Sequence, residues 1–146
     1  MKNTLKEGLE YTHRYRVPET KTVPHIYRES KPFQEIPRVF ATGYMVALME
    51  WACAEAMVPH LEPGECSVGV DVNVTHTAAT PPGMEVTVYV RCTGVDGLRS
   101  KWEIVARDEV DEIGRGTHER FTVNIDRFNA RVAKKIDQAS NVAQVR

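Results

Sequence analysis

The sequence lacks long apolar runs, an excess of charge of one sign, and paired cysteines. No apolar stretch approaches the ~20 residues that a membrane-spanning helix needs. The first ten residues are polar and lack the apolar core of a secretory signal peptide. We therefore expect a soluble, cytoplasmic protein without a membrane partner.

The charges nearly cancel, since 19 Lys and Arg residues face 20 Asp and Glu residues, for a net charge of −1. This balance argues against a nucleic-acid-binding protein that relies on a basic surface. The three cysteines (Cys53, Cys66 and Cys92) are widely spaced and form no CxxC pair. They are interpreted as reduced, structural thiols, and no metal site is expected.

The length of 146 residues fits a single domain that spans 1–146. The hydrophobic share of 42% and the charged share of 27% are ordinary for a globular protein and exclude wholesale disorder. A chain of this length buries about two thirds of its unfolded surface, so it needs no disulfides.

The N-terminal part predicts a strand followed by a long irregular segment. Residues 9–17 alternate loosely in polarity and end at a proline. Residues 18–37 contain four prolines and several apolar side chains, so we expect a lid-like loop with at most a short helical turn.

Residues 40–57 are rich in Ala, Leu and Met and predict a helix with Thr42 as its N-cap. This helix is apolar almost all round, so we expect it to be buried on most faces.

Four strands are predicted next, at 66–77, 84–95, 98–109 and 115–125. In the first of them Val68, Val70, Val72 and Val74 should share one face, and Asp96-Gly97 predicts a hairpin turn between the second and the third. Residues 127–138 are compatible with a helix, and we expect a frayed tail at 139–146.

The order strand, loop, buried helix, four strands indicates an α+β hotdog fold, in which a long antiparallel sheet wraps one central helix. Such a sheet leaves its edge strands unpaired, so we expect a homodimer formed through an edge.

Glu50 is the most anomalous residue of the apolar helix. Its neighbours one turn away are Val46, Ala47, Cys53 and Ala54. Because an unpaired buried carboxylate is costly, Glu50 is either paired and functional or reaches solvent through its long side chain.

His76 continues the alternation of the valines and lies just before the Pro81-Pro82-Gly83 turn. It is either a core histidine with satisfied hydrogen bonds or a general base. A carboxylate on the packed helix, such as Glu50, favours the second interpretation because it would fix the imidazole tautomer.

Thr42 either caps the helix or serves as a nucleophile or water-positioning group at its positive end. Thr42 and Glu50 lie eight residues apart, or about 12 Å along one helix, so they cannot touch. An imidazole could bridge them, or the set could assemble across a dimer interface.

Two more residues are candidates for substrate contacts. Gly69 interrupts a strand, either as a bulge or where a ligand approaches bare backbone. Arg120 lies in the last strand, where most arginines face solvent.

Three long segments resemble the fluoroacetyl-CoA thioesterases of the hotdog superfamily. They are Val-Phe-Ala-Thr-Gly-Tyr-Met-Val-Ala-Leu-Met-Glu-Trp-Ala-Cys at 39–53, Asn-Val-Thr-His-Thr-Ala-Ala-Thr-Pro-Pro-Gly-Met at 73–84, and Val-Asp-Glu-Ile-Gly-Arg-Gly-Thr-His-Glu-Arg at 110–120. The resemblance covers nearly the whole chain.

The resemblance implies a dimeric thioesterase that splits a small acyl-CoA into acid and CoA, with no cofactor. It implies Thr42, Glu50 and His76 as the catalytic set. It also implies that Gly69 contacts the substrate through its backbone and that Arg120 lines the acyl pocket. An apolar lid is implied at Val23, Ile26, Phe33 and Ile36.

One position departs from this family, which carries an aromatic lid residue where this chain has Ile36. A lid without that ring changes pocket volume and water exclusion. Another short acyl-CoA or an acyl carrier thioester therefore stays an alternative substrate. A non-catalytic acyl-CoA-binding module and an enoyl-CoA hydratase are alternatives from other classes.

Overall fold

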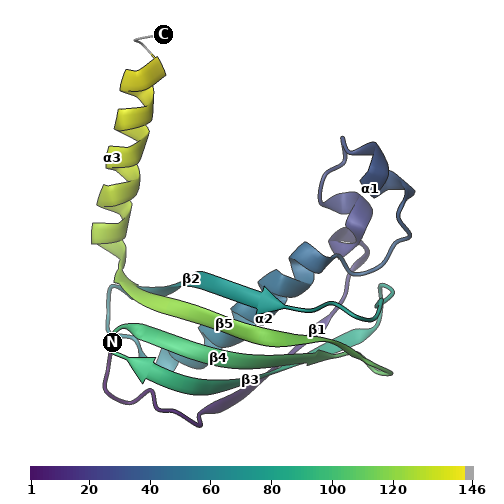
Figure 1. The fold of residues 1–146 in the computed structure, drawn as a ribbon, viewed down its shortest axis with the longest axis horizontal. Coiled ribbons are helices and arrows are strands. Elements are labelled where there is room, and N and C mark those ends of the chain that lie inside the picture. Colours follow the sequence, from purple (N-terminus) through teal and green to yellow (C-terminus); the bar gives the residue numbers. More distant parts are fainter. Residues whose placement is uncertain (144–146) are drawn as a thin grey trace.

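The computed structural model describes residues 1–143 and shows one curled antiparallel sheet wrapped around a long helix (Figure 1). The strands are β1 (Glu10–Arg16), β2 (Glu65–Val74), β3 (Glu85–Asp96), β4 (Arg99–Arg107) and β5 (Glu112–Asn124). Their order in the sheet is β1-β3-β4-β5-β2, so β1 and β2 form its edges. The α+β hotdog architecture expected from the sequence is confirmed.

Helix α2 (Thr42–Met57) lies across the sheet and supplies much of the core. Its buried residues pack against the valines of β3 and against Trp102, Ile104 and Ala106 of β4. Trp102 satisfies its indole by donating from Nε1 to Ser100 Oγ at 2.9 Å, so the large ring can be buried completely. These side chains form the inward faces of β3 and β4.

Helix α2 is less enclosed than its composition suggested. Trp51 is 45% exposed, and Ala47 one turn before it is also exposed. The expectation of burial on most faces is thus only partly met within one chain, since an apolar strip of the helix is left open.

The expected valine face of β2 is broken by a bulge at Val70. Before the bulge Val68 lies opposite Phe121, and after it Val72 lies opposite His118. Phe121 and His118 are three residues apart in one strand and face opposite sides. The prediction that the valines share one face is therefore wrong, because the extra residue reverses the phase of the strand.

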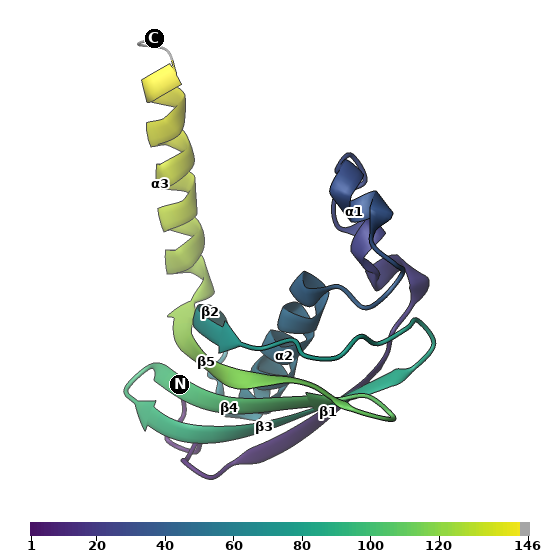
Figure 2. The same cartoon turned by 45° about the vertical axis from the view of Figure 1, so that its right-hand side comes forward.

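The proline-rich segment 18–37 forms two short 3-10 turns and the short helix α1 (Lys31–Glu35). The proline φ restraint keeps it from forming longer elements. Figure 2 shows that α1 stands away from the sheet, above the start of α2. A bridge between Thr22 and Phe40 ties the base of this segment together.

The C-terminal helix α3 (Ile125–Ala143) projects from the end of β5 (Figure 1). It includes positions 139–143, where a frayed tail was expected, and the rest of that expected tail lies outside the described residues. The hairpin turn at Asp96-Gly97 is confirmed, with Gly97 at φ +56°. Within the described chain, none of the helices is both long and apolar enough to cross a membrane.

Candidate active site

Thr42 and His76 form a direct pair at the start of α2. The helix N-cap is Ala41, with no side-chain cap, and Thr42 is the first helical residue. The predicted capping role of Thr42 is wrong. Its hydroxyl Oγ1 instead lies 2.8 Å from Nδ1 of His76.

The segment that carries His76 continues alongside β5 beyond the end of β2. Thr75 and Thr77 donate their backbone N–H groups to the carbonyls of Arg115 and Ile113, both at 2.8 Å. This register turns His76 toward α2. A Cβ at Gly114 would overlap the Thr75 carbonyl oxygen, so the bare backbone of that glycine permits the close approach.

Burial lowers the pKa of His76, and the nearby backbone of Ala78 partly opposes this effect. The imidazole is therefore neutral near pH 7, the state that a general base requires. Its Nε2 atom is buried and, within the residues that the structure describes, has no hydrogen-bond partner.

A groove of about 270 Å³ opens beside this pair. Its lining combines Thr42 and His76 with small or apolar residues, namely Val23, Val39, Phe40, Thr77, Ala78 and Ala79. Of the lid residues implied by the resemblance, Val23 is placed at this groove. Phe33 lies in α1 with its ring tilted against that of Tyr27, 6.0 Å between ring centroids, whereas Ile36 is 39% exposed. These two lie outside the groove lining.

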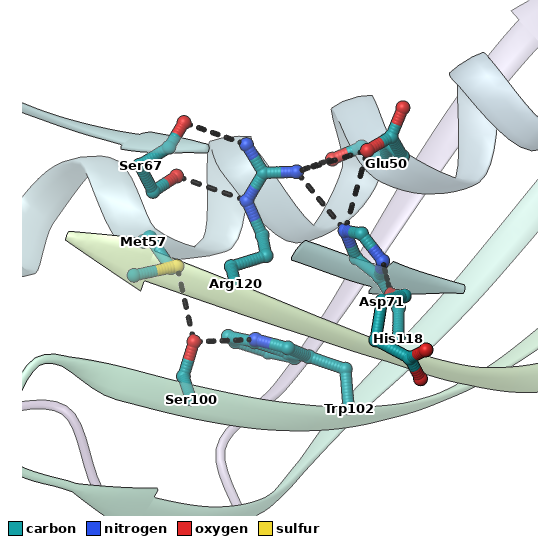
Figure 3. Close-up of polar contacts among 8 residues, drawn as sticks. All are labelled: Glu50, Met57, Ser67, Asp71, Ser100, Trp102, His118 and Arg120. Carbon is teal, nitrogen blue, oxygen red and sulfur yellow. Dashed lines mark hydrogen bonds and ion pairs between the residues drawn. The ribbon is translucent and has the colours of Figure 1, made fainter. Parts of the chain in front are cut away.

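Glu50 belongs to a second polar cluster, between α2 and the β5–β2 edge (Figure 3). Its Oε1 atom lies 3.6 Å from His118 Nε2 and 3.9 Å from Arg120 Nη1. The Glu50 side chain is still 40% exposed. The carboxylate therefore reaches solvent, as one sequence interpretation expected, and also lies beside the charged Arg120.

Arg120 is almost fully buried and anchors this cluster. Its Nε donates to Ser67 Oγ at 2.9 Å and its Nη2 donates to the Ser67 carbonyl at 2.8 Å. Nη1 donates to the Glu50 carbonyl at 3.3 Å and to His118 Nε2 at 3.1 Å. Burial lowers the pKa of Arg120, while the neighbouring Cys53 and Glu50 oppose the shift.

Gly69 lies where the carboxylate of Glu50 meets the sheet. A Cβ at this position would overlap Glu50 Oε1 and come within 3.0 Å of His118 Cε1. The structure therefore brings Gly69, Arg120 and Glu50 together. Glu50, Gly69 and His118 line a hollow of about 420 Å³ that opens at the β2 edge.

The structure does not bring Glu50 to His76 within one chain. Among the described residues, the Glu50 carboxylate lies near His118 and the charged Arg120, and the side-chain hydrogen-bond partner of His76 is Thr42. Within the described residues of one chain, no imidazole therefore bridges Thr42 and Glu50.

Sequence reasoning missed His118, which is 1% exposed. Its Nδ1 lies 2.6 Å from the Asp71 carbonyl. One signal was present in the sequence, since His118 and Arg120 are two residues apart in a strand and therefore share a face.

Comparison with known proteins adds to this geometry. A family model described as fluoroacetyl-CoA-specific thioesterase matches residues 17–126. A fluoroacetyl-CoA thioesterase from Streptantibioticus cattleyicolor is 55% identical over 135 residues, which cover 92% of this chain and 97% of that protein.

Two solved structures show the same fold. A threonine-to-alanine mutant of a fluoroacetyl-CoA thioesterase, in complex with fluoroacetate, has a TM-score of 0.88 and 54% identity, covering 90% of this chain and 98% of that one. A thioesterase superfamily member from Thermus thermophilus has a TM-score of 0.84 and 28% identity, covering 95% and 98% of the two chains.

Fold and site thus define a hotdog-fold thioesterase, an enzyme that hydrolyses an acyl-CoA thioester. Within that class, the chain belongs to the fluoroacetyl-CoA-specific thioesterase family.

Proposed function

We propose that this chain hydrolyses fluoroacetyl-CoA to fluoroacetate and CoA, with Thr42, His76 and Glu50 as its catalytic residues. The observation that carries the proposal is the Thr42–His76 pair at the mouth of a small groove of about 270 Å³. Its other lining residues are small or apolar, which suits a short acyl group. The relative with 55% identity is a fluoroacetyl-CoA thioesterase, which supports the same acyl group here.

Thr42 is the nucleophile in this proposal. Its Oγ1 lies 2.8 Å from His76 Nδ1, which leaves no room for a water molecule between the two atoms. Oγ attacks the thioester carbonyl carbon while His76 accepts the hydroxyl proton. The C–S bond then breaks, and the CoA sulfur leaves with the proton from His76. A water molecule, deprotonated by His76, hydrolyses the resulting acyl ester and regenerates Thr42.

Trapping distinguishes this route from direct attack by water. Rapid acid quench followed by mass spectrometry should find the acyl group on Thr42 during turnover. Thr42→Ser should also form the adduct, because it keeps the hydroxyl. Turnover without any adduct in either protein would show that Thr42 positions water instead.

The site is completed by a second copy of the chain. Glu50 and Gly69 lie at the free edge of β2, where Val70 is 49% and Val72 is 45% exposed. Unpaired edge strands with apolar side chains favour pairing. A homodimer through this edge would bring the Glu50 cluster of one copy to the Thr42–His76 pair of the other. Glu50 would then orient His76, and the backbone at Gly69 would stabilise the oxyanion.

Mixing two nearly inactive variants tests this arrangement. Glu50→Gln and His76→Ala should each retain only a small residual activity alone. If each site takes Glu50 from one copy and His76 from the other, a mixed dimer holds one intact site. Equal amounts after subunit exchange should then recover about a quarter of wild-type activity, because half of the dimers are mixed and each has one of two sites. No recovery after confirmed exchange would show that each chain uses its own Glu50.

The substrate is tested by free-thiol release from a panel of short acyl-CoAs that includes acetyl-CoA and fluoroacetyl-CoA. A strong preference for fluoroacetyl-CoA is expected. Hydrolysis of other short esters without that preference would favour the alternative that Ile36 suggests, a thioesterase for a different acyl group. Binding without thiol release would indicate a non-catalytic module. A cytoplasmic location stays a prediction of the sequence.

A further inference from the structure

We propose that His118 is a positioning residue that holds Arg120 away from Glu50, so that the Glu50 carboxylate stays available to the reaction. This inference rests on the proposed function, because it concerns how Glu50 is kept ready for catalysis. Figure 3 shows His118 beside both groups, with its Nε2 atom facing the guanidinium group of Arg120 and the carboxylate of Glu50.

The tautomer of His118 follows from its contacts. A backbone carbonyl can only accept, so the 2.6 Å contact with the Asp71 carbonyl requires a proton on Nδ1. Nε2 lies 3.1 Å from Arg120 Nη1, which can only donate. Nε2 therefore carries no proton, and His118 is neutral. Burial also lowers the pKa of His118, as does the adjacent Arg120 charge, against the opposing effect of the Asp71 carbonyl and of Glu50.

The donors of Arg120 are then almost fully used. Its two Nη1 protons are directed to the Glu50 carbonyl and to His118 Nε2, while Nε and Nη2 donate to Ser67. The nearest Glu50 carboxylate oxygen lies 3.9 Å from Nη1, which is too far for a hydrogen bond. The positive charge of Arg120 is thus near Glu50, but no guanidinium N–H donates a hydrogen bond to the Glu50 carboxylate.

Removal of the acceptor on His118 would free one Nη1 proton. The buried Arg120 charge would then gain most by turning that proton to Glu50 Oε1, less than 1 Å beyond hydrogen-bond range. A carboxylate engaged in that way is a weaker acceptor for the imidazole that it must orient. Gly69 has no Cβ that would displace the Glu50 carboxylate, so the carboxylate keeps its position with or without the His118 acceptor.

The test compares two substitutions of similar size. His118→Leu removes the acceptor, and His118→Gln restores one through its side-chain amide oxygen. We expect the leucine variant to lower kcat by about tenfold or more with little change in KM, and the glutamine variant to recover most of that loss. Circular dichroism would confirm that each variant is folded. Equal kcat in both variants would then overturn the proposal, since a purely structural role would not discriminate between them.

A double-mutant cycle identifies the route of the effect. In a Glu50→Gln background, His118→Leu should change the residual rate by less than about twofold, because its effect acts through the carboxylate. A full, independent loss in that background would overturn the inference.

The wild-type protein provides a measurement that does not depend on the variants folding. Its ¹⁵N NMR spectrum should show His118 neutral, with the proton on Nδ1, at pH 7. A charged imidazolium or the opposite tautomer would overturn the proposal. If the wild type releases no thiol from any acyl-CoA, the proposed function fails instead, and the NMR result still reports on the cluster.

Discussion

Thr42 Oγ1 and His76 Nδ1 lie 2.8 Å apart although 34 positions separate the two residues in the chain. The contact exists because α2 begins at Thr42 and because the segment after β2 stays hydrogen-bonded to β5. A hydroxyl that touches a neutral imidazole is the arrangement from which a proton can be removed.

Loss of the imidazole should remove most of the activity without unfolding the protein. His76→Ala is expected to lower kcat by about 10²–10⁴-fold, the usual contribution of a general base. His76 is only partly buried, so the melting temperature should change little. Thiol release and thermal melts would be measured side by side. Turnover near the wild-type rate would show that another group is the base.

The pH profile should follow the lowered pKa of His76. Burial disfavours the charged imidazole, so the neutral form persists below the ordinary histidine value of about 6.5. Activity should rise with pH through that lowered pKa, so the midpoint of the acid limb should lie below pH 6.5. Between the lowered pKa of folded His76 and the ordinary value of about 6.5, the unfolded chain binds more protons than the folded one. Stability should therefore fall as the pH drops from about 6.5 to the lowered pKa. An acid limb of kcat/KM centred above pH 6.5 would contradict this assignment.

Gly69→Ala should damage the site more than the fold. A Cβ at Gly69 would overlap Glu50 Oε1, and the carboxylate is the flexible end of its side chain, so it can move aside. We expect kcat to fall by about tenfold or more, with a modest change in stability. Gly94→Ala is the matched control, because it is also in a strand and its Cβ would meet no atom within 4 Å. Similar kinetics for both variants would argue against a role for Gly69.

Ile36→Phe tests the departure of the lid from the family pattern. Ile36 is 39% exposed, so a larger ring is accommodated without a clash in the core. A ring at the lid should exclude water better and raise the ratio of kcat/KM for fluoroacetyl-CoA over acetyl-CoA by a few-fold. Val132→Phe on α3 is a control of similar exposure at the far end of the molecule (Figure 1). An unchanged ratio would place selectivity outside the lid.

The elements of the fold were largely predictable because their signals are local. The apolar run at 40–57, the alternating valines of β3 and the Asp96-Gly97 turn each fix their structure within a few residues. The errors had physical causes that composition does not reveal. A single extra residue at Val70 reversed the phase of β2, and Ala41 rather than Thr42 became the N-cap of α2.

The sequence by itself determined the hotdog fold and the family, because these depend on periodicity and on long matching segments. It also indicated Thr42, Glu50 and His76 as candidate site residues. Only the tertiary structure decided that Thr42 contacts His76 while Glu50 joins Arg120 and His118 in a separate cluster. The reason is that strand pairing and the bulge in β2 set distances between residues far apart in the chain, and no local pattern encodes those distances.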